Sequence, residues 1–193
     1  MPRQPRTDFA GAIHHVTARG NNKHPIFRDD ADNWVFTEML GAACESHGLA
    51  AIAWCLMGNH MHLVVQSRSG QLSSAMHWLT LRYARRYNTR YRHSGHVFQG
   101  RYHSMLVNRD PYLLEVVRYV LLNPVRARLC DAATDWRWSS AREILGLRPT
   151  PDWADFSLIH ALLGEGGGDP RERLDRFLRA SESGSCYRVS ITQ

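Results

Sequence analysis

The sequence predicts an α+β protein built on an antiparallel sheet, and three observations carry this prediction. Short apolar or β-branched runs indicate strands, at 12–20, 49–57 and 61–67. Longer runs with apolar residues at helical spacing indicate helices, at 30–48 and 69–91. Only a short turn containing Gly58 and Asn59 separates the second and third strands, which indicates a hairpin and antiparallel pairing.

The first strand, AIHHVTARG, contains two consecutive histidines, His14 and His15. Consecutive residues of a strand point to opposite faces, so these two imidazoles cannot both serve one site. The helix that follows begins after an aspartate at position 30 and ends at Gly48, which are the residue types expected at those ends.

The long helix over 69–91 has an apolar stripe of Leu72, Met76, Leu79 and Tyr83. The arginines of its second half fall away from that stripe. A short strand is expected at 105–108, before the last helix of the core.

The helix over 110–124 is bounded by Asp110 and Pro111 at its start and by Pro124 at its end. Its apolar stripe is formed by Leu113, Val117, Val120 and Leu121. The element order is therefore β–α–β–β–α–β–α.

An antiparallel sheet with helices on one face, similar to the ferredoxin-like split β-α-β, is the simplest arrangement for this order. We expect this domain to cover residues 1–148. Residues 149–193 look like an extension with short helices at 157–164 and 170–180 and a flexible tail.

Charge is distributed unevenly along the chain. The formal net charge is +6 and the sequence pI about 9.5. Between Glu45 and Asp110 there is no acidic residue, while arginines alternate with tyrosines there. This pattern favours phosphate contacts and base stacking on nucleic acid. The alternative is a basic helix that is merely solvated. Candidate DNA contacts are Arg82, Arg85, Arg86, Arg90, Arg92, Arg101, Tyr102 and Arg126.

Two features bear on the compartment. No run of about 18 apolar residues is present, so we expect no membrane span. The four cysteines form no C-x-x-C pair, which argues against a disulfide framework and favours the cytoplasm.

The motif GNHMHLVV places His60 and His62 on one face at the start of a strand. Two neutral imidazoles side by side can share a divalent cation. They can also be two partly exposed polar positions at the end of a sheet, and the motif alone does not decide between these.

Tyr119 and Asn123 lie four residues apart, on one face of the last helix. With His60 and His62, the Asn123 amide oxygen would complete a site of neutral ligands for a cation, next to a phenol. A phenol has a pKa of about 10, and a nearby cation favours the phenolate nucleophile. The alternatives are a packed tyrosine and a helix-capping asparagine, and Asp110 or Glu115 on the same helix could also reach the site.

Five ordered blocks resemble the REP-associated tyrosine transposases, a single-tyrosine branch of the HUH endonucleases. They are ARGNNKHPIFRDDAD, GNHMHLVV, GHVFQGRYHSMLV, RYVLLNPVRARL and WRWSSAR, and the similarity spans roughly residues 12–142. The resemblance implies an HUH core that nicks and rejoins single-stranded DNA near palindromic hairpins. Tyr119 would form a 5′-phosphotyrosine, and His60 and His62 would hold Mg²⁺ or Mn²⁺.

Asn123 would be the third ligand, at a position where related transposases carry a Gln or similar residue. The resemblance also implies a bacterial, nucleoid-associated protein and a monomer whose tyrosine acts in cis. Three other hypotheses remain at this point: a catalytically silent DNA- or RNA-hairpin-binding module, a hydrolase of small phosphate esters, and an RNA-binding protein. The phosphate-ester hydrolase would need acidic residues that the arginine-rich middle lacks.

Overall fold

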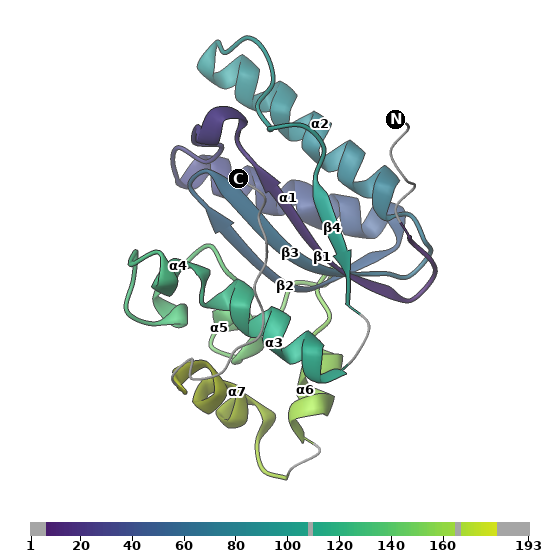
Figure 1. Ribbon diagram of the computed structural model, residues 1–193, viewed down its shortest axis with the longest axis vertical. Coiled ribbons are helices and arrows are strands. Elements are labelled where there is room, and N and C mark those ends of the chain that lie inside the picture. Colours follow the sequence, from purple (N-terminus) through teal and green to yellow (C-terminus); the bar gives the residue numbers. More distant parts are fainter. Residues whose placement is uncertain (1–6, 108–109, 165–166, 181–193) are drawn as a thin grey trace.

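A computed structural model describes residues 7–107, 110–164 and 167–180 of the chain. Its centre is a four-stranded sheet in the order β2-β3-β1-β4 (Figure 1). All three strand pairs are antiparallel. The strands are β1 (Ala12–Arg19), β2 (Leu49–Met57), β3 (His60–Ser67) and β4 (His103–Leu106).

The connections give the split β-α-β topology that the sequence predicts. α1 (Asp30–His47) links β1 to β2, the turn at Gly58 and Asn59 links β2 to β3, and α2 (Leu72–Tyr91) links β3 to β4. β1 and β3 are therefore central neighbours, although about 40 residues and one helix separate them along the chain. The predicted fold class is confirmed, and β4 begins two residues earlier than expected.

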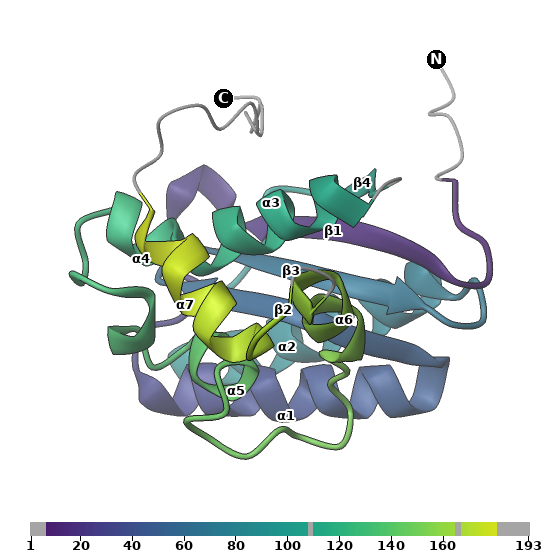
Figure 2. The ribbon, with the colours of Figure 1, turned by 90° about the horizontal axis from the view of Figure 1, so that it is seen from below.

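α1 and α2 cover one face of the sheet (Figure 2). The Asp29 side chain caps α1 by accepting from the Asp32 amide, and Gly48 ends the helix in the left-handed conformation at φ 62°. The predicted stripe of α2 is fully buried against the sheet and α1. Burial of that stripe removes apolar surface from water and fixes the helix in place.

The opposite face carries α3 (Asp110–Leu121), and α6 (Ser157–Gly164) and α7 (Pro170–Arg179) lie beside it at the β2 edge of the sheet (Figure 2). The expectation that the helices share one face is therefore wrong. The stripe of α3 is buried as predicted, because a sheet with two apolar faces needs a cover on each. Helical periodicity shows which side of a helix is buried, but it does not say which face of the sheet receives it.

The last helix of the core also ends earlier than predicted. α3 stops at Leu121, and α4 (Asn123–Arg126) begins two residues later. Pro124 does not terminate a helix here; it occupies the first turn of α4, where a missing amide hydrogen costs nothing. The remaining short elements are η1 (Asn21–Lys23), η2 (Ala133–Asp135) and α5 (Ala141–Ile144).

The described part of the C-terminal segment packs on the sheet and on α3. Ala51 of β2 exchanges backbone hydrogen bonds with Trp153 and Asp155, and the Trp153 ring lies 4.9 Å from that of Trp54. Helices in both predicted places, α6 and α7, add buried leucines to the same core. The domain boundary after residue 148 stays a prediction. In the described residues, no helix is long and apolar enough to cross a bilayer.

Candidate active site

His60 and His62 lie on the face of β3 that α3 covers. His62 is fully buried and His60 half-buried, with ring centroids 5.1 Å apart. The register of the sheet places Thr17 opposite His62 and Arg19 opposite His60. Both imidazoles therefore project from the centre of the sheet at one end, as the alternation of the strand predicts.

Hydrogen bonds fix which nitrogen of His60 faces the site. Asn59 donates its amide nitrogen to the Lys23 carbonyl at 3.1 Å, so its Oδ1 is turned toward His60. That oxygen lies 2.7 Å from His60 Nδ1, which therefore carries the proton. His60 also hydrogen-bonds with the side chain of Asn123.

His62 is held in the same way by a third histidine, His15. Its Nδ1 lies 3.1 Å from His15 Nε2, and the two rings are stacked with centroids 5.3 Å apart. Among the described residues, His62 Nε2 is buried and has no hydrogen-bond partner. A buried ring nitrogen without a partner is costly unless a ligand occupies the space in front of it.

Burial keeps all three imidazoles neutral near pH 7. It lowers the pKa of His15 and of His60 to about 4 and that of His62 well below its usual value. The nearby positive charge of Arg19 lowers the His60 pKa further, and a hydrogen bond with Asn123 partly opposes this. Neutral imidazoles offer lone pairs to a metal ion without competition from protons.

α3 brings Tyr119 against these histidines. The Tyr119 ring centroid is 5.5 Å from that of His62 and 6.0 Å from that of His15, in edge-to-face contacts. The Arg126 guanidinium lies 4.8 Å from the centre of the Tyr119 ring. The phenol that the sequence singles out thus lies beside the H-x-H pair of its own chain.

Asn123 contacts both Tyr119 and His60. Its Nδ2 donates to the Tyr119 carbonyl at 3.1 Å, which leaves Oδ1 as its acceptor, and its side chain also hydrogen-bonds with His60. The capping role that the sequence allowed and the place beside His60 are both realised.

These residues fit a divalent cation held by two imidazoles and an amide oxygen. The orphaned Nε2 of His62 supports this fit, since a metal ion would satisfy it. No group of three or more His, Cys, Asp or Glu among the described residues could hold a metal, so Glu115 does not join the histidines. The side chain of Asp110 lies outside the described residues.

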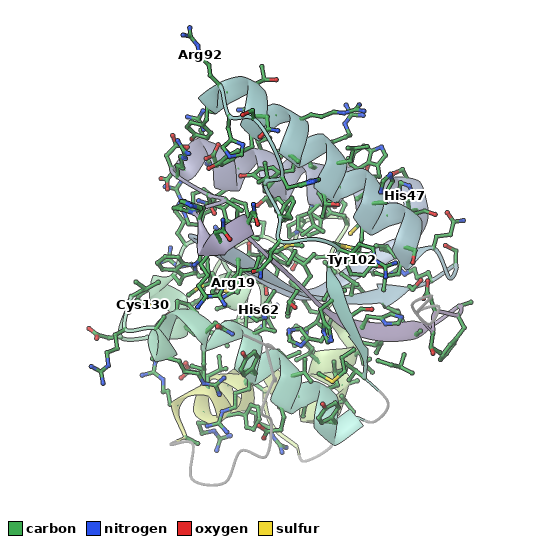
Figure 3. All side chains as sticks on the ribbon, turned by 45° about the horizontal axis from the view of Figure 1, so that its top comes forward. Arg19, His47, His62, Arg92, Tyr102 and Cys130 are labelled. Carbon is green, nitrogen blue, oxygen red and sulfur yellow. The ribbon has the colours of Figure 1, made fainter. Side chains whose placement is uncertain are left out.

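The arginines of α2 lie elsewhere. Arg82, Arg85 and Arg86 are exposed on the helix that covers the other face of the sheet (Figure 2). Arg85 and Arg101 line a groove of about 740 Å³ between α2 and the segment 95–102. Arg92 points away from the end of α2 (Figure 3). Their role in DNA binding stays a prediction.

Two of the predicted contacts need correction. Arg90 has two acidic partners from the start of α1. Its guanidinium binds the carboxylates of Asp29 at 2.6 Å and Asp32 at 2.5 Å. The Tyr102 ring is only 7% exposed and its hydroxyl meets Ser73, so it offers no face for stacking. Tyr83 and Tyr87, which alternate with the arginines of α2, are buried as well and offer no exposed ring for base stacking.

Sequence reasoning did not assign His15 or Arg19 to the site. The signal that could have found them is the alternation of β1, which puts His15, Thr17 and Arg19 on one face. The sequence alone does not show that β1 pairs with β3, which is what brings these residues next to His60 and His62.

Comparison with known proteins agrees with this geometry. The family model described as "Transposase IS200 like" matches residues 9–122, more than half of the chain. This protein belongs to the IS200-like transposase family. The match ends one residue before Asn123, so it covers the two histidines and Tyr119 but not the amide.

Two relatives extend the comparison. A Haemophilus influenzae protein named for the REP-associated tyrosine transposases is 27% identical over 148 residues, 70% of this chain and 83% of that protein. A solved REP-associated tyrosine transposase bound to a REP hairpin superposes with a TM-score of 0.64. It is 18% identical, and the match covers 82% of this chain and 96% of that one. The second likeness supports the fold.

Proposed function

We propose that this transposase-family protein nicks and rejoins single-stranded DNA beside a palindromic hairpin, with Tyr119 as its nucleophile. One observation carries the proposal: the Tyr119 ring contacts the buried His62, whose Nε2 has no partner in the described residues. The hairpin is carried over from the solved relative, whose structure holds one.

The proposed reaction is a transesterification. The Tyr119 oxygen forms a bond to the scissile phosphorus as the bond from phosphorus to the 3′ oxygen of the preceding nucleotide breaks. The phenolic proton leaves to solvent and the departing 3′ oxygen takes one up, so the products are a 5′-phosphotyrosine and a free 3′-OH. Attack of a 3′-OH on the phosphotyrosine reverses the step and rejoins a strand.

The chain's own residues have distinct parts in this reaction. His60, His62 and Asn123 would hold Mg²⁺ or Mn²⁺, which when bound supplies positive charge beside the phosphate and the phenol. Asn123 also bonds the Tyr119 carbonyl, which ties the nucleophile's backbone to the candidate ligand set. Arg126 lies against the Tyr119 ring, which places a positive charge next to the proposed nucleophile.

A cleavage assay tests the proposal. The substrate is an end-labelled DNA hairpin with single-stranded flanks, and the control is an unstructured strand of equal length. With Mn²⁺ we expect a 3′-OH fragment and a protein-linked fragment from the hairpin, and neither with EDTA. Tight hairpin binding without cleavage at any metal concentration would contradict the proposal and favour a binding-only module.

A further inference from the structure

Arg19, the last residue of β1, lies at the edge of the candidate active site. It is the cross-strand partner of His60 and shares a face with Thr17 and His15. Figure 3 shows Arg19 and His62 at the same end of the sheet. The charge of Arg19 is close enough to His60 to lower the pKa of that imidazole.

The guanidinium of Arg19 is incompletely satisfied. Its Nε is buried without a hydrogen-bond partner, and no carboxylate pairs with it among the described residues. Arg68 and Arg90 each pair with an aspartate. Arg118 and Arg148 also have a buried Nε without a partner, but their Nη2 atoms bond the Ala180 carbonyl and the Glu143 carboxylate. A buried charged donor without an acceptor is costly, so its presence beside a group of neutral side chains indicates an anionic ligand.

Backbone hydrogen bonds fix the position of Arg19 at the end of β1. The Arg19 carbonyl accepts from the Gln99 amide at 2.8 Å, and the next amide, of Gly20, donates to the Asn59 carbonyl at 2.8 Å. A Cβ on Gly20 would lie 2.0 Å from the His24 carbonyl oxygen, so this close approach requires glycine. Arg19 is thus fixed relative to the turn that orients His60.

We infer that Arg19 binds the scissile phosphate, as a catalytic residue that donates hydrogen bonds to its non-bridging oxygens. This rests on the proposed function, which it deepens. A guanidinium matches two phosphate oxygens at once. Negative charge on those oxygens grows when the Tyr119 oxygen attacks, so a donor already fixed in place stabilises the transition state more than the bound strand.

The test separates phosphate binding from cleavage. Binding is measured with the Tyr119→Phe protein and a set of hairpin strands, each with one phosphate near the hairpin replaced by a neutral methylphosphonate. With Arg19 present, we expect one position to weaken binding about tenfold or more. In Tyr119→Phe/Arg19→Met, that position should no longer matter, because the partner of the charge is gone.

Cleavage and folding are measured on single variants. Arg19→Met should cleave about 100-fold more slowly or worse, and Arg19→Lys should recover only part of the rate. Arg68→Met is the matched control, since it removes an equal charge at the far end of β3 and should cleave as wild type. Arg19→Met should unfold at no lower urea concentration than wild type, because it loses an unsatisfied buried donor.

Each outcome decides between the claims. The inference is overturned if each methylphosphonate weakens binding equally with and without Arg19. It is also overturned if Arg19→Met slows cleavage only because it greatly lowers the stability of the protein. Coupling of Arg19 to one phosphate in a protein that never cleaves shows phosphate binding by Arg19 but refutes both its catalytic role and the proposed function. Cleavage by wild type at a phosphate that is not coupled to Arg19 refutes the inference and supports the function.

Discussion

At the scale of single residues, the Nδ1 atoms of His60 and His62 are each held by a different partner. Asn59 holds the first and His15 the second. Histidines that bind metals generally have their second nitrogen fixed in this way, which sets the tautomer and the ring orientation. The Nε2 atom of His62 has no partner among the described residues, and His60 hydrogen-bonds in addition with Asn123.

The metal hypothesis makes a direct prediction for these two residues. His60→Ala or His62→Ala should abolish cleavage at ordinary Mg²⁺ or Mn²⁺ levels, since one imidazole and one amide hold a divalent ion poorly. Asn123→Ala should be milder, because water can replace a neutral oxygen ligand. Binding of Mn²⁺ measured by calorimetry without DNA should follow the same order. Full Mn²⁺ binding by His62→Ala would refute the assignment.

A second prediction concerns His15. His15→Leu removes the partner of His62 Nδ1 and should weaken Mn²⁺ binding about 10-fold to 100-fold. His14→Leu is the matched control, because His14 points to the other face and bonds Asp8 instead. If both variants fold and bind Mn²⁺ as wild type does, His15 does not orient the site.

The residue types of the site could be predicted, but not their full set. H-x-H alternation predicted that His60 and His62 share a face, and the i, i+4 spacing predicted that Tyr119 and Asn123 lie close together; the structure has both arrangements, while the roles of these residues stay predictions. His15 was expected to face away from His14, and it does. Its contact with His62 depends on how β1 and β3 pair, which local sequence does not encode.

At the scale of elements, α2 serves packing along one side and is exposed along the other. Tyr83, a member of the predicted apolar stripe, and Tyr87, one turn later, both pack into the core. A helix whose apolar residues recur at this spacing buries one face. Large aromatic rings are among the side chains whose burial contributes most free energy. Arg90 ties the end of α2 to the start of α1 through Asp29 and Asp32.

Arg90 should therefore affect stability and not DNA binding. Arg90→Gln leaves the nearly buried Asp32 carboxylate without its cation, so we expect a clearly lower urea midpoint of unfolding. Arg85→Gln removes an equal charge from an exposed position and should leave the midpoint almost unchanged. The two variants are compared by circular dichroism. Equal midpoints would show that the Arg90 clamp does not matter for folding.

Arg85 and Arg86 keep their predicted role as phosphate contacts. For a single strand, each lost contact changes the slope of log affinity against log salt by about 0.7. Replacing both with Gln should weaken binding across sequences and flatten that slope by roughly 1 to 1.5. The cleavage position should not move, since phosphate contacts position a strand without reading it. A slope equal to that of wild type would mean that these arginines are only solvated.

At the scale of the whole molecule, the candidate site is assembled from β1, β3, α3 and α4 of one chain. Tyr119 reaches His62 without help from a second copy, which supports the expectation that the tyrosine acts in cis. The arginines of α2 lie across the sheet (Figure 2). A DNA molecule that touches both must pass around an edge of the sheet.

The order of the main elements and their boundaries to within three residues could be predicted, because hydrophobic periodicity and turn residues are local signals. The second layer of helices could not. Trp153 lies in a stretch that looks like a linker, yet its ring packs on Trp54 of β2. Such long-range contacts are decided by which surface remains uncovered once the sheet has formed.

The central claim is that Tyr119 becomes covalently joined to DNA. The most direct measurement is mass spectrometry of the protein–DNA adduct after incubation with a hairpin substrate and Mn²⁺. We expect a nucleotide on Tyr119, no adduct with Tyr119→Phe, and a normal adduct with Tyr112→Phe, which removes a phenolic oxygen earlier on α3. An adduct that persists in Tyr119→Phe, or that maps to any other residue, would contradict this claim.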